Sequence, residues 1–292
     1  MLQRSYTVEE GVFSVGSSMS VFYRDFRPLT DNTDKVPIVY LPGLMRTARD
    51  FDRVASHFAD ERRVVTVDTR GRGRGGRSDD PANYDFDQMI GDVWALTDHL
   101  GVERMVLVGL ALGAFMSWRM ASRRPDRVIG VVVNDTGTET VNRVGKKMVA
   151  LADQGEYSFD EALDKLREPN RKNFPDFGLE DWRAYTLQVY AETTPGKWKR
   201  DFHPAILEAW AGTKERWPSL WDEYSTIKEV PVLILRGENS EFLTLEQADK
   251  MAGALPRAKT VSVQGRGHPL LLDEPASLTA IREVLAQADI KL

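Results

Sequence analysis

Short runs of apolar, largely β-branched residues alternate along this chain with segments whose apolar residues recur at helical spacing. This alternation is typical of a mostly parallel sheet that is covered by helices on both faces. The expected strands comprise residues 6–15, 19–26, 36–41, 64–67, 105–108, 128–133, 230–235 and 260–263. The expected helices comprise residues 48–58, 90–100, 112–121, 245–254 and 276–288. The sequence therefore predicts an α/β fold.

The alternation stops after Asn134 for about ninety residues, which is too long for an ordinary connection between a strand and a helix. Residues 137–227 are charged, rich in Trp and Tyr, and contain no strand-like run. We therefore expect several helices in this stretch. The chain is predicted to consist of a core, formed by residues 1–136 and 228–292, and a helical cap, or lid, formed by residues 137–227.

The composition favours an ordinary soluble globular protein. Hydrophobic residues make up 42% of the 292 residues, charged residues make up 28%, and the formal net charge is −5. This mild acidity provides no overall attraction to nucleic acid or to an anionic membrane. The N-terminus lacks a signal-peptide core, and no run approaches the roughly 18 apolar residues of a membrane span. We expect a cytoplasmic protein, and no feature indicates a particular oligomeric state.

Residue types that bind metals are scarce. Cysteine is absent, which excludes disulfides, thiolate metal sites and cysteine nucleophiles. The histidines are His57, His99, His203 and His268, and no two of them have the i, i+4 spacing of a zinc-binding helix. No glycine loop followed by a phosphate-binding lysine occurs at the expected strand ends. We expect neither a metal nor a cofactor.

The strongest chemical signal is VLVGLALG, residues 106–113, which reads as a buried strand, a glycine-flanked turn and a helix. This is the layout of a nucleophile elbow, G-x-S-x-G, in which small residues permit a strained turn that lifts the central side chain above the sheet. The central residue here is Ala111, whose methyl group cannot attack a carbonyl. Neither Ser117, inside the following helix, nor Ser240 is expected to replace it as a nucleophile.

Further motifs occur in a fixed order along the chain. They are LPGL (41–44), VDTRGRG (67–73), VGLALG (108–113), VVNDTG (132–137), RGENSEF (236–242) and GRGHPLLLDEP (265–275). Through these motifs nearly the whole chain resembles the α/β-hydrolase superfamily, in particular its capped esterases, lactonases, epoxide-hydrolase-like enzymes and carbon–carbon bond hydrolases. The resemblance implies a mostly parallel, eight-stranded sheet with helices on both faces and a helical cap inserted after the sixth strand.

The resemblance also implies roles for individual residues. His268, in the turn after the last strand, matches the general base, and imidazole has a pKa suited to proton transfer near neutrality. Glu241 matches the acid that orients this base; since related sequences more often carry Asp at that place, Asp135 is the alternative acid. The backbone N–H groups of Leu44 and Leu112 match the oxyanion hole.

The residues around the expected site narrow the substrate class. Position 111 lacks the Asp nucleophile of epoxide hydrolases and dehalogenases, and Leu44 has no side-chain donor for a halide. A cap lined by aromatic residues favours a small-molecule, largely apolar ester or lactone over a sugar or a phosphate. The aromatic residues of the expected cap include Trp182, Tyr185, Tyr190, Trp198, Trp210, Trp217 and Trp221.

Ala111 leaves several interpretations open. The chain can be an inactivated variant of a serine hydrolase of esters or lactones, in which serine occupies position 111 of the active form. It can instead be a carbon–carbon bond hydrolase of ring-cleavage products. It can be a non-catalytic ligand-binding protein on the hydrolase scaffold. Finally, it can be an enzyme in which His268 activates water or abstracts a substrate proton without a covalent step.

Residues 70–77, RGRGRGGR, are similar to the arginine- and glycine-rich segments of RNA-binding proteins. The tract has no interleaved aromatic residues, and the remaining chain is acidic, so we expect no nucleic-acid partner. Related hydrolases have a shorter loop here. The sequence predicts a long and mobile surface loop.

Overall fold

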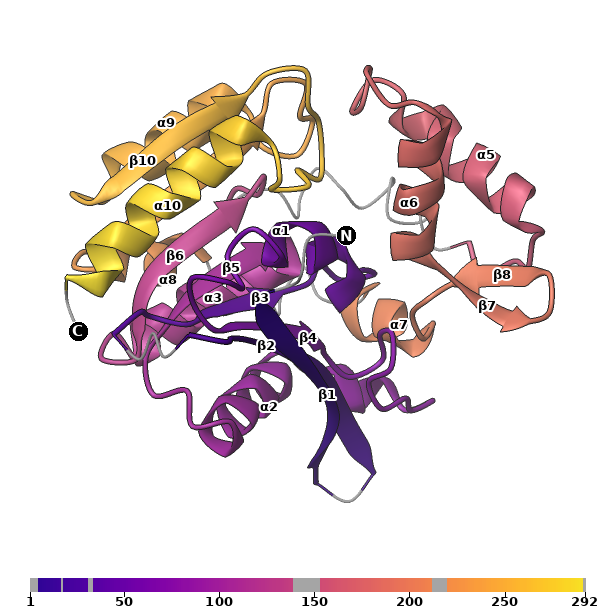
Figure 1. Ribbon diagram of the computed structural model, residues 1–292, viewed down its shortest axis with the longest axis horizontal. Coiled ribbons are helices and arrows are strands. Elements are labelled where there is room, and N and C mark those ends of the chain that lie inside the picture. The colour runs from indigo at the N-terminus through magenta and orange to yellow at the C-terminus, as the bar shows by residue number, and fades with distance from the viewer. Residues whose placement is uncertain (1–4, 17, 31–33, 139–152, 212–219, 291–292) are drawn as a thin grey trace.

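The computed structural model describes residues 5–16, 18–30, 34–138, 153–211 and 220–290 and has an eight-stranded sheet at its centre (Figure 1). The strand order is β1-β2-β4-β3-β5-β6-β9-β10. All neighbouring strands are parallel except at β2, which is antiparallel to both β1 and β4. The predicted α/β-hydrolase fold is confirmed. The strands are β1 (Tyr6–Val15), β2 (Met19–Pro28), β3 (Ile38–Leu41), β4 (Val64–Asp68), β5 (Met105–Leu110), β6 (Val128–Asn134), β9 (Val232–Gly237) and β10 (Ala258–Val263).

Burial explains why the central strands read as continuous apolar runs. Every residue of β3, β4, β5 and β6 is buried, as expected for parallel strands that are covered on both faces. The edge strand β1 is different, because most of its residues are exposed. The carboxyl ends of the four central strands therefore emerge from a rigid, water-excluding core.

Two apolar clusters lie on opposite faces of this sheet. On one face the core contains residues of α2 (Phe86–His99), α3 (Leu112–Arg123), α8 (Leu220–Thr226) and α9 (Leu245–Gly253). On the other face it contains residues of η1 (Ala48–Phe51), α1 (Asp52–Ala55) and α10 (Pro275–Asp289). A further short helix, η2 (Pro81–Tyr84), precedes α2. Helices thus cover both faces, as the alternation predicted.

The expected cap contains more than helices. Its described elements are α5 (Phe159–Asn170), α6 (Leu179–Val189), β7 (Tyr190–Thr194), β8 (Lys197–Arg200) and α7 (Ala205–Ala211). The antiparallel hairpin β7–β8 corrects the expectation of helices alone. Its strands are short, and their residues are mostly exposed or half-buried, so they carry no apolar run that would reveal them. Helix α8 lies within residues 137–227 but packs on α3 of the core.

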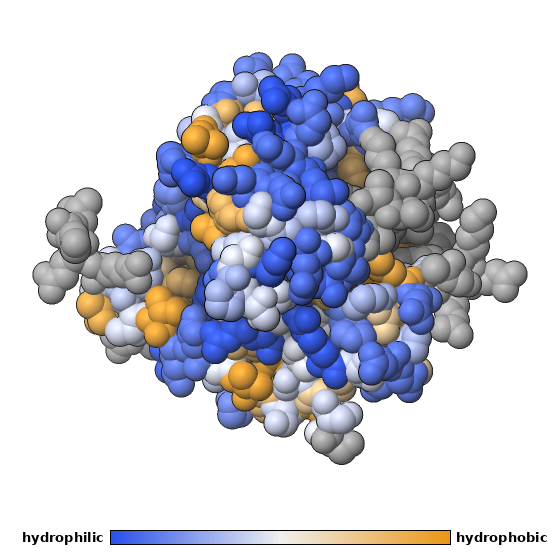
Figure 2. All heavy atoms as spheres, turned by 90° about the vertical axis from the view of Figure 1, so that its right-hand side faces the viewer, coloured by the Kyte–Doolittle hydropathy of each residue, from blue (hydrophilic) through white to orange (hydrophobic). Residues whose placement is uncertain are grey.

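The face of the molecule seen in Figure 2 is mostly hydrophilic, with scattered apolar residues. Leu179 and Leu187 are among the exposed apolar residues of the expected cap. Its aromatic residues are instead turned inward. Trp182 and Tyr185 are buried in one cluster with Phe174 and with Leu271 of the core. Most of the described aromatic residues of the expected cap therefore serve as packing, in a cluster that also includes Leu271. Trp217 lies outside the described residues.

The loop of residues 70–77 is held in place rather than free, in contrast to the expected mobile loop. Arg72 is fully buried and forms an isolated antiparallel bridge with Phe202, just after β8. Two backbone hydrogen bonds flank this bridge: Gly73 N–H to Asp201 O (3.1 Å) and His203 N–H to Gly71 O (2.8 Å). The long loop thereby joins the core to the end of the cap hairpin.

The Asp201 carboxylate reinforces this junction. It accepts hydrogen bonds from Arg49, at the start of η1, at 2.8 Å and from Arg77, in the loop after β4, at 2.7 Å. Asp201 is buried, so both ion pairs are partly shielded from water. One carboxylate thus connects three segments that are far apart in the sequence.

Replacing Asp201 with alanine should lower the free energy of unfolding by about 2 kcal/mol, because two charge-assisted hydrogen bonds are lost. Denaturant titration measures this change. The matched control is Asp98→Ala, which removes an exposed partner of Arg127 and should change the free energy of unfolding by less than about 0.5 kcal/mol. Equal, small effects of the two substitutions would show that the Asp201 junction does not stabilise the fold.

Asp68, the last residue of β4, holds two loops through one carboxylate. It accepts the backbone N–H of Ala48 at 2.6 Å and that of Arg74 at 3.1 Å. The loop packs directly on it, since a Cβ added to Gly73 would lie 2.2 Å from Asp68 Oδ2. The side chain is buried, and no ion pair to it is present among the described residues. Burial raises the pKa of Asp68 to about 6.

This raised pKa predicts a pH dependence of stability. The folded state holds the Asp68 proton more tightly than the unfolded state, so ionisation destabilises the fold as the pH rises from about 4 to about 6. Asp68→Asn removes that contribution. The difference in unfolding free energy, variant minus parent, should therefore increase by up to about 3 kcal/mol between pH 4 and pH 7. A difference that does not change with pH would contradict the prediction.

Candidate active site

The turn between β5 and α3 has the strained geometry of an elbow. Ala111 has φ 48° and ψ −106°, a conformation that L-residues rarely adopt and that costs about 1–3 kcal/mol. A Cβ added to Gly109 would lie 2.3 Å from the backbone of Gly113, and one added to Gly113 would lie 2.1 Å from Leu41 O. Both glycines are therefore required by the close approach of backbones, as the motif predicted.

Strand register brings three loops to the same edge of the sheet. Gly109 of β5 pairs with Leu41 of β3, and Leu110 pairs with Asn134 of β6. The next residues of each strand are consequently neighbours: the loop 42–46, Ala111 and Asp135. In open parallel sheets the carboxyl ends of the strands are where ligands bind.

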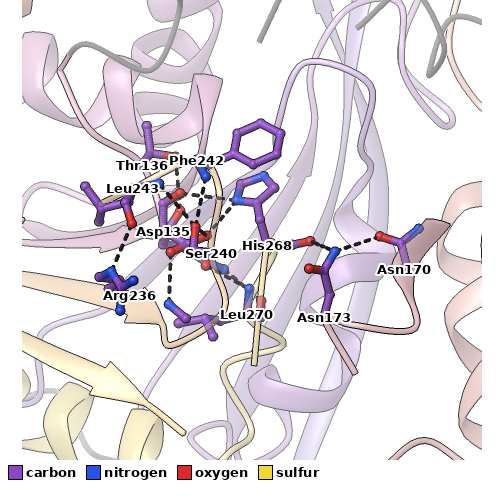
Figure 3. Close-up of polar contacts among 12 residues, drawn as sticks. Asp135, Thr136, Asn170, Asn173, Arg236, Ser240, Phe242, Leu243, His268 and Leu270 are labelled. Atoms are coloured by element: carbon purple, nitrogen blue, oxygen red, sulfur yellow. Dashed lines mark hydrogen bonds and ion pairs between the residues drawn. The ribbon is translucent and has the colours of Figure 1, made fainter. Parts of the chain in front are cut away.

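His268 lies against the end of β6, as Figure 3 shows. Its Nδ1 is 3.0 Å from Asp135 Oδ2, and its ring stacks on Phe242 with a centroid distance of 3.8 Å. A proton on Nδ1, donated to the carboxylate, leaves the lone pair on Nε2. Nε2 makes no hydrogen bond within the part of the chain that the structure describes, so it can accept a proton from a bound molecule.

Asp135 is fully buried and has a positive φ of 49°. Its Oδ1 accepts the backbone N–H of Gly237 at 2.9 Å, and its Oδ2 accepts the hydroxyl of Ser240 at 2.6 Å in addition to His268 (Figure 3). Three donors thus surround this carboxylate. They also fix the direction in which Asp135 faces the imidazole.

The two candidate acids differ in position. Glu241 is exposed, whereas Asp135, which the sequence ranks as the alternative, is the carboxylate that hydrogen-bonds to His268. Ser240 determines how this loop faces the site. Its hydroxyl oxygen accepts the N–H groups of Phe242 and Leu243, both at 3.1 Å, and its proton is donated to Asp135.

Two asparagines that sequence reasoning missed hold the histidine loop. Asn134 bonds to both backbone groups of Leu270, at 2.9 and 3.2 Å. Asn173, after α5 of the cap, donates to His268 O at 3.1 Å and accepts the N–H of Gly267 at 2.9 Å. Asn134 could be found from the sequence, because it directly precedes Asp135 in VVNDTG. Asn173 carries no such signal, because it comes from a distant segment.

The backbone groups expected to form an oxyanion hole lie beside the elbow. Leu112 is the first residue of α3, where the helix leaves its N–H groups without intrahelical partners. Leu44 lies in the loop after β3. Neither N–H has a hydrogen-bond acceptor among the residues described, so both can bind a developing negative charge.

The structure also bears on metals and membranes. Across the described residues, no group of three or more His, Asp or Glu side chains is arranged to hold a metal ion. Within the same ranges, no helix is long and apolar enough to cross a membrane.

Several known proteins are similar to this chain. The chain is 29% identical over 256 residues to a 3-hydroxybutyrate-oligomer hydrolase of Cupriavidus necator, covering 82% of this chain and 85% of that protein. It is 26% identical to a bifunctional esterase/perhydrolase of Acinetobacter calcoaceticus, covering 92% and 96%. A crystal structure of an alpha/beta hydrolase from Novosphingobium aromaticivorans is similar with a TM-score of 0.86 and 28% identity, over 98% and 99% of the two chains.

The family model for the alpha/beta hydrolase fold matches residues 36–275, which is most of the chain. The match includes β3 to β6, the elbow, Asp135 and His268. This protein therefore belongs to the alpha/beta hydrolase fold family, and it is a hydrolase of that fold.

Proposed function

We propose that this protein is a serine-hydrolase-type esterase for a small, largely apolar ester or lactone, in which the nucleophile position is occupied by Ala111. The observation that carries the proposal is the 3.0 Å hydrogen bond between His268 and Asp135, beside an elbow that keeps its strained geometry. A base, an orienting acid and two unbonded backbone donors are the parts that acyl transfer requires. The nucleophile is the part that is missing.

In the active form, serine at position 111 would attack the ester carbonyl while His268 Nε2 takes its proton. Asp135 would stabilise the resulting imidazolium through Nδ1. The N–H groups of Leu44 and Leu112 would hold the oxyanion of the tetrahedral intermediate. His268 would then protonate the leaving alcohol, and water, activated by the same histidine, would release the acid. We propose Asp135 rather than Glu241 as the acid, since Asp135 bonds to the base.

The substrate class rests on the relatives and on the cap. Proteins named as an oligomer hydrolase of 3-hydroxybutyrate and as an esterase/perhydrolase support an ester substrate. The aromatic cluster of the cap, around Trp182 and Tyr185, also includes Leu271, three residues after His268. An apolar cap next to the base favours an apolar acyl or alkyl group. We propose residues 137–227, apart from α8, as the lid over this site.

Alanine at position 111 has a direct chemical consequence. Its methyl group has no lone pair and no acidic proton, so no acyl-enzyme can form. Loss of the nucleophile from a triad typically lowers turnover by around a million-fold. We therefore propose that the chain as it stands does not hydrolyse esters by this route.

A second candidate function follows from the same observation. The His268–Asp135 pair is complete without a nucleophile, so Nε2 can abstract a proton from water or from a carbon next to a carbonyl. Such a proton transfer is one step expected of a carbon–carbon bond hydrolase. Exchange of a substrate proton with deuterated solvent by the unmodified protein, absent in His268→Ala, would favour this candidate.

Ala111→Ser tests the main proposal. The variant should gain one adduct of a fluorophosphonate probe by intact mass, and it should hydrolyse members of an ester and lactone panel. The unmodified protein should gain no adduct and remain at least about a thousand-fold slower. The matched control, Ala111→Ser with His268→Ala, should lose both labelling and turnover. A serine variant that is folded but unlabelled and inert would overturn the proposal.

A pair of near-isosteric substitutions distinguishes the two acids. In the Ala111→Ser protein, Asp135→Asn should lower kcat by about a thousand-fold or more, because the imidazolium loses its orienting carboxylate. Glu241→Gln should change kcat by less than about threefold, since an exposed charge contributes little. The opposite result would assign the acid to Glu241.

A further inference from the structure

Arg72 is a fully buried arginine that contacts no carboxylate in the described part of the chain. Its Nη1 donates to Thr69 Oγ1 at 2.8 Å and to Arg70 O at 2.9 Å. Its Nε donates to Leu44 O at 2.6 Å. Its Nη2 is buried and has no hydrogen-bond partner. A buried guanidinium with these neighbours is unusual, because a buried charge normally has an opposite charge beside it.

Arg70, two residues earlier in the same loop, shows the ordinary arrangement. It is buried and forms a two-pronged ion pair with Asp92, with both distances 2.6 Å. Arg72 has no such partner, and burial lowers the pKa of its guanidinium to about 9. The group therefore stays charged at neutral pH, and its charge is not neutralised by direct contact.

The Arg72 charge, which no described carboxylate contacts directly, lies beside the loop expected to bind the oxyanion. Arg72 fixes the carbonyl of Leu44, whereas the N–H of the same residue is unbonded in the structure. Fixing the carbonyl holds the peptide plane between Leu44 and Met45, which limits how far Leu44, and with it its N–H, can reorient. A cation next to that residue also favours negative charge at the N–H.

The backbone of Arg72 links the same loop to the cap. It pairs with Phe202, which is buried in a small apolar cluster with Tyr84 and Ile206. Leu44 packs against this cluster as well. One residue thus contacts the cap segment through its backbone and the oxyanion loop through its side chain.

We propose that Arg72 is a positioning residue for the oxyanion hole: its guanidinium orients Leu44, and docking of the cap segment 201–203 on its backbone keeps the guanidinium in place. The inference rests on the proposed function, because it assumes that the Leu44 N–H binds an oxyanion. It adds a cationic residue that the sequence analysis placed in a mobile loop.

The test uses the Ala111→Ser protein with Arg72→Met or Arg72→Lys, and Arg70→Lys as the matched control. Arg72→Met should lower kcat by about 10- to 100-fold while KM changes by less than about threefold, since a donor to the transition state is misplaced. Affinity for an arylboronic acid, which forms an oxyanion-like adduct on serine, should fall by the same factor. Arg72→Lys should restore part of the kcat and part of the boronic acid affinity. Folded Arg70→Lys should change neither of these two quantities.

Unchanged boronic acid affinity and kcat in folded Arg72→Met would overturn the inference. Equal losses in Arg70→Lys and Arg72→Lys would also overturn it, because the effect would then be a general loosening of the loop. If Ala111→Ser itself is inert, the proposed function fails. Amide hydrogen exchange in the chain with Ala111 then tests the positioning role of Arg72 independently of catalysis. Arg72→Met, or Arg72→Lys if the former does not fold, should then speed amide exchange in residues 43–48 by at least about tenfold. Unchanged exchange there would contradict the positioning role.

Discussion

The buried carboxylate of Asp135 connects the parts of this molecule that the chemistry needs. It directly follows β6, accepts the N–H of Gly237 at the end of β9 and the hydroxyl of Ser240 in the loop after it, and bonds to His268 after β10. Strand register places it next to Ala111 at the end of β5. A buried charge is stable only when donors surround it, so these contacts hold three loops in one arrangement whether or not a nucleophile is present. This explains how an elbow and a base can persist around alanine.

Two other buried charges shape the opposite side of the site. Asp68 holds Ala48 without an ion pair, and Arg72 holds Leu44 without a contacting carboxylate, although both belong to the segment around the end of β4. Attraction between them acts at longer range and raises the pKa of Arg72, against the larger effect of burial. Each charge therefore lowers stability while it fixes backbone groups of the loop 42–48. Such local destabilisation is common where a protein must keep polar groups oriented for binding or catalysis.

The sequence predicts the core better than the cap for physical reasons. Strands such as β5 and β6 are buried on both faces and leave apolar runs, and the glycines around Ala111 are required by backbone contacts. The hairpin β7–β8 is short and only partly buried, so it leaves no such pattern. Which of Glu241 and Asp135 faces the base depends on the hydrogen bond that ties the Ser240 loop to Asp135. This is a tertiary contact, which the sequence pattern does not reveal. The loop around Arg72 is glycine-rich and charged, so it reads as mobile, yet contacts with the distant Phe202 hold it.

We propose that Asp135 and His268 form a working base in the chain as it stands. Proton NMR of the unmodified protein tests it most directly. We predict a far-downfield Nδ1–H resonance that is lost in Asp135→Asn and retained in Glu241→Gln, because a proton held against a buried carboxylate is strongly deshielded and exchanges slowly. A resonance that survives in Asp135→Asn and disappears in Glu241→Gln would contradict the claim.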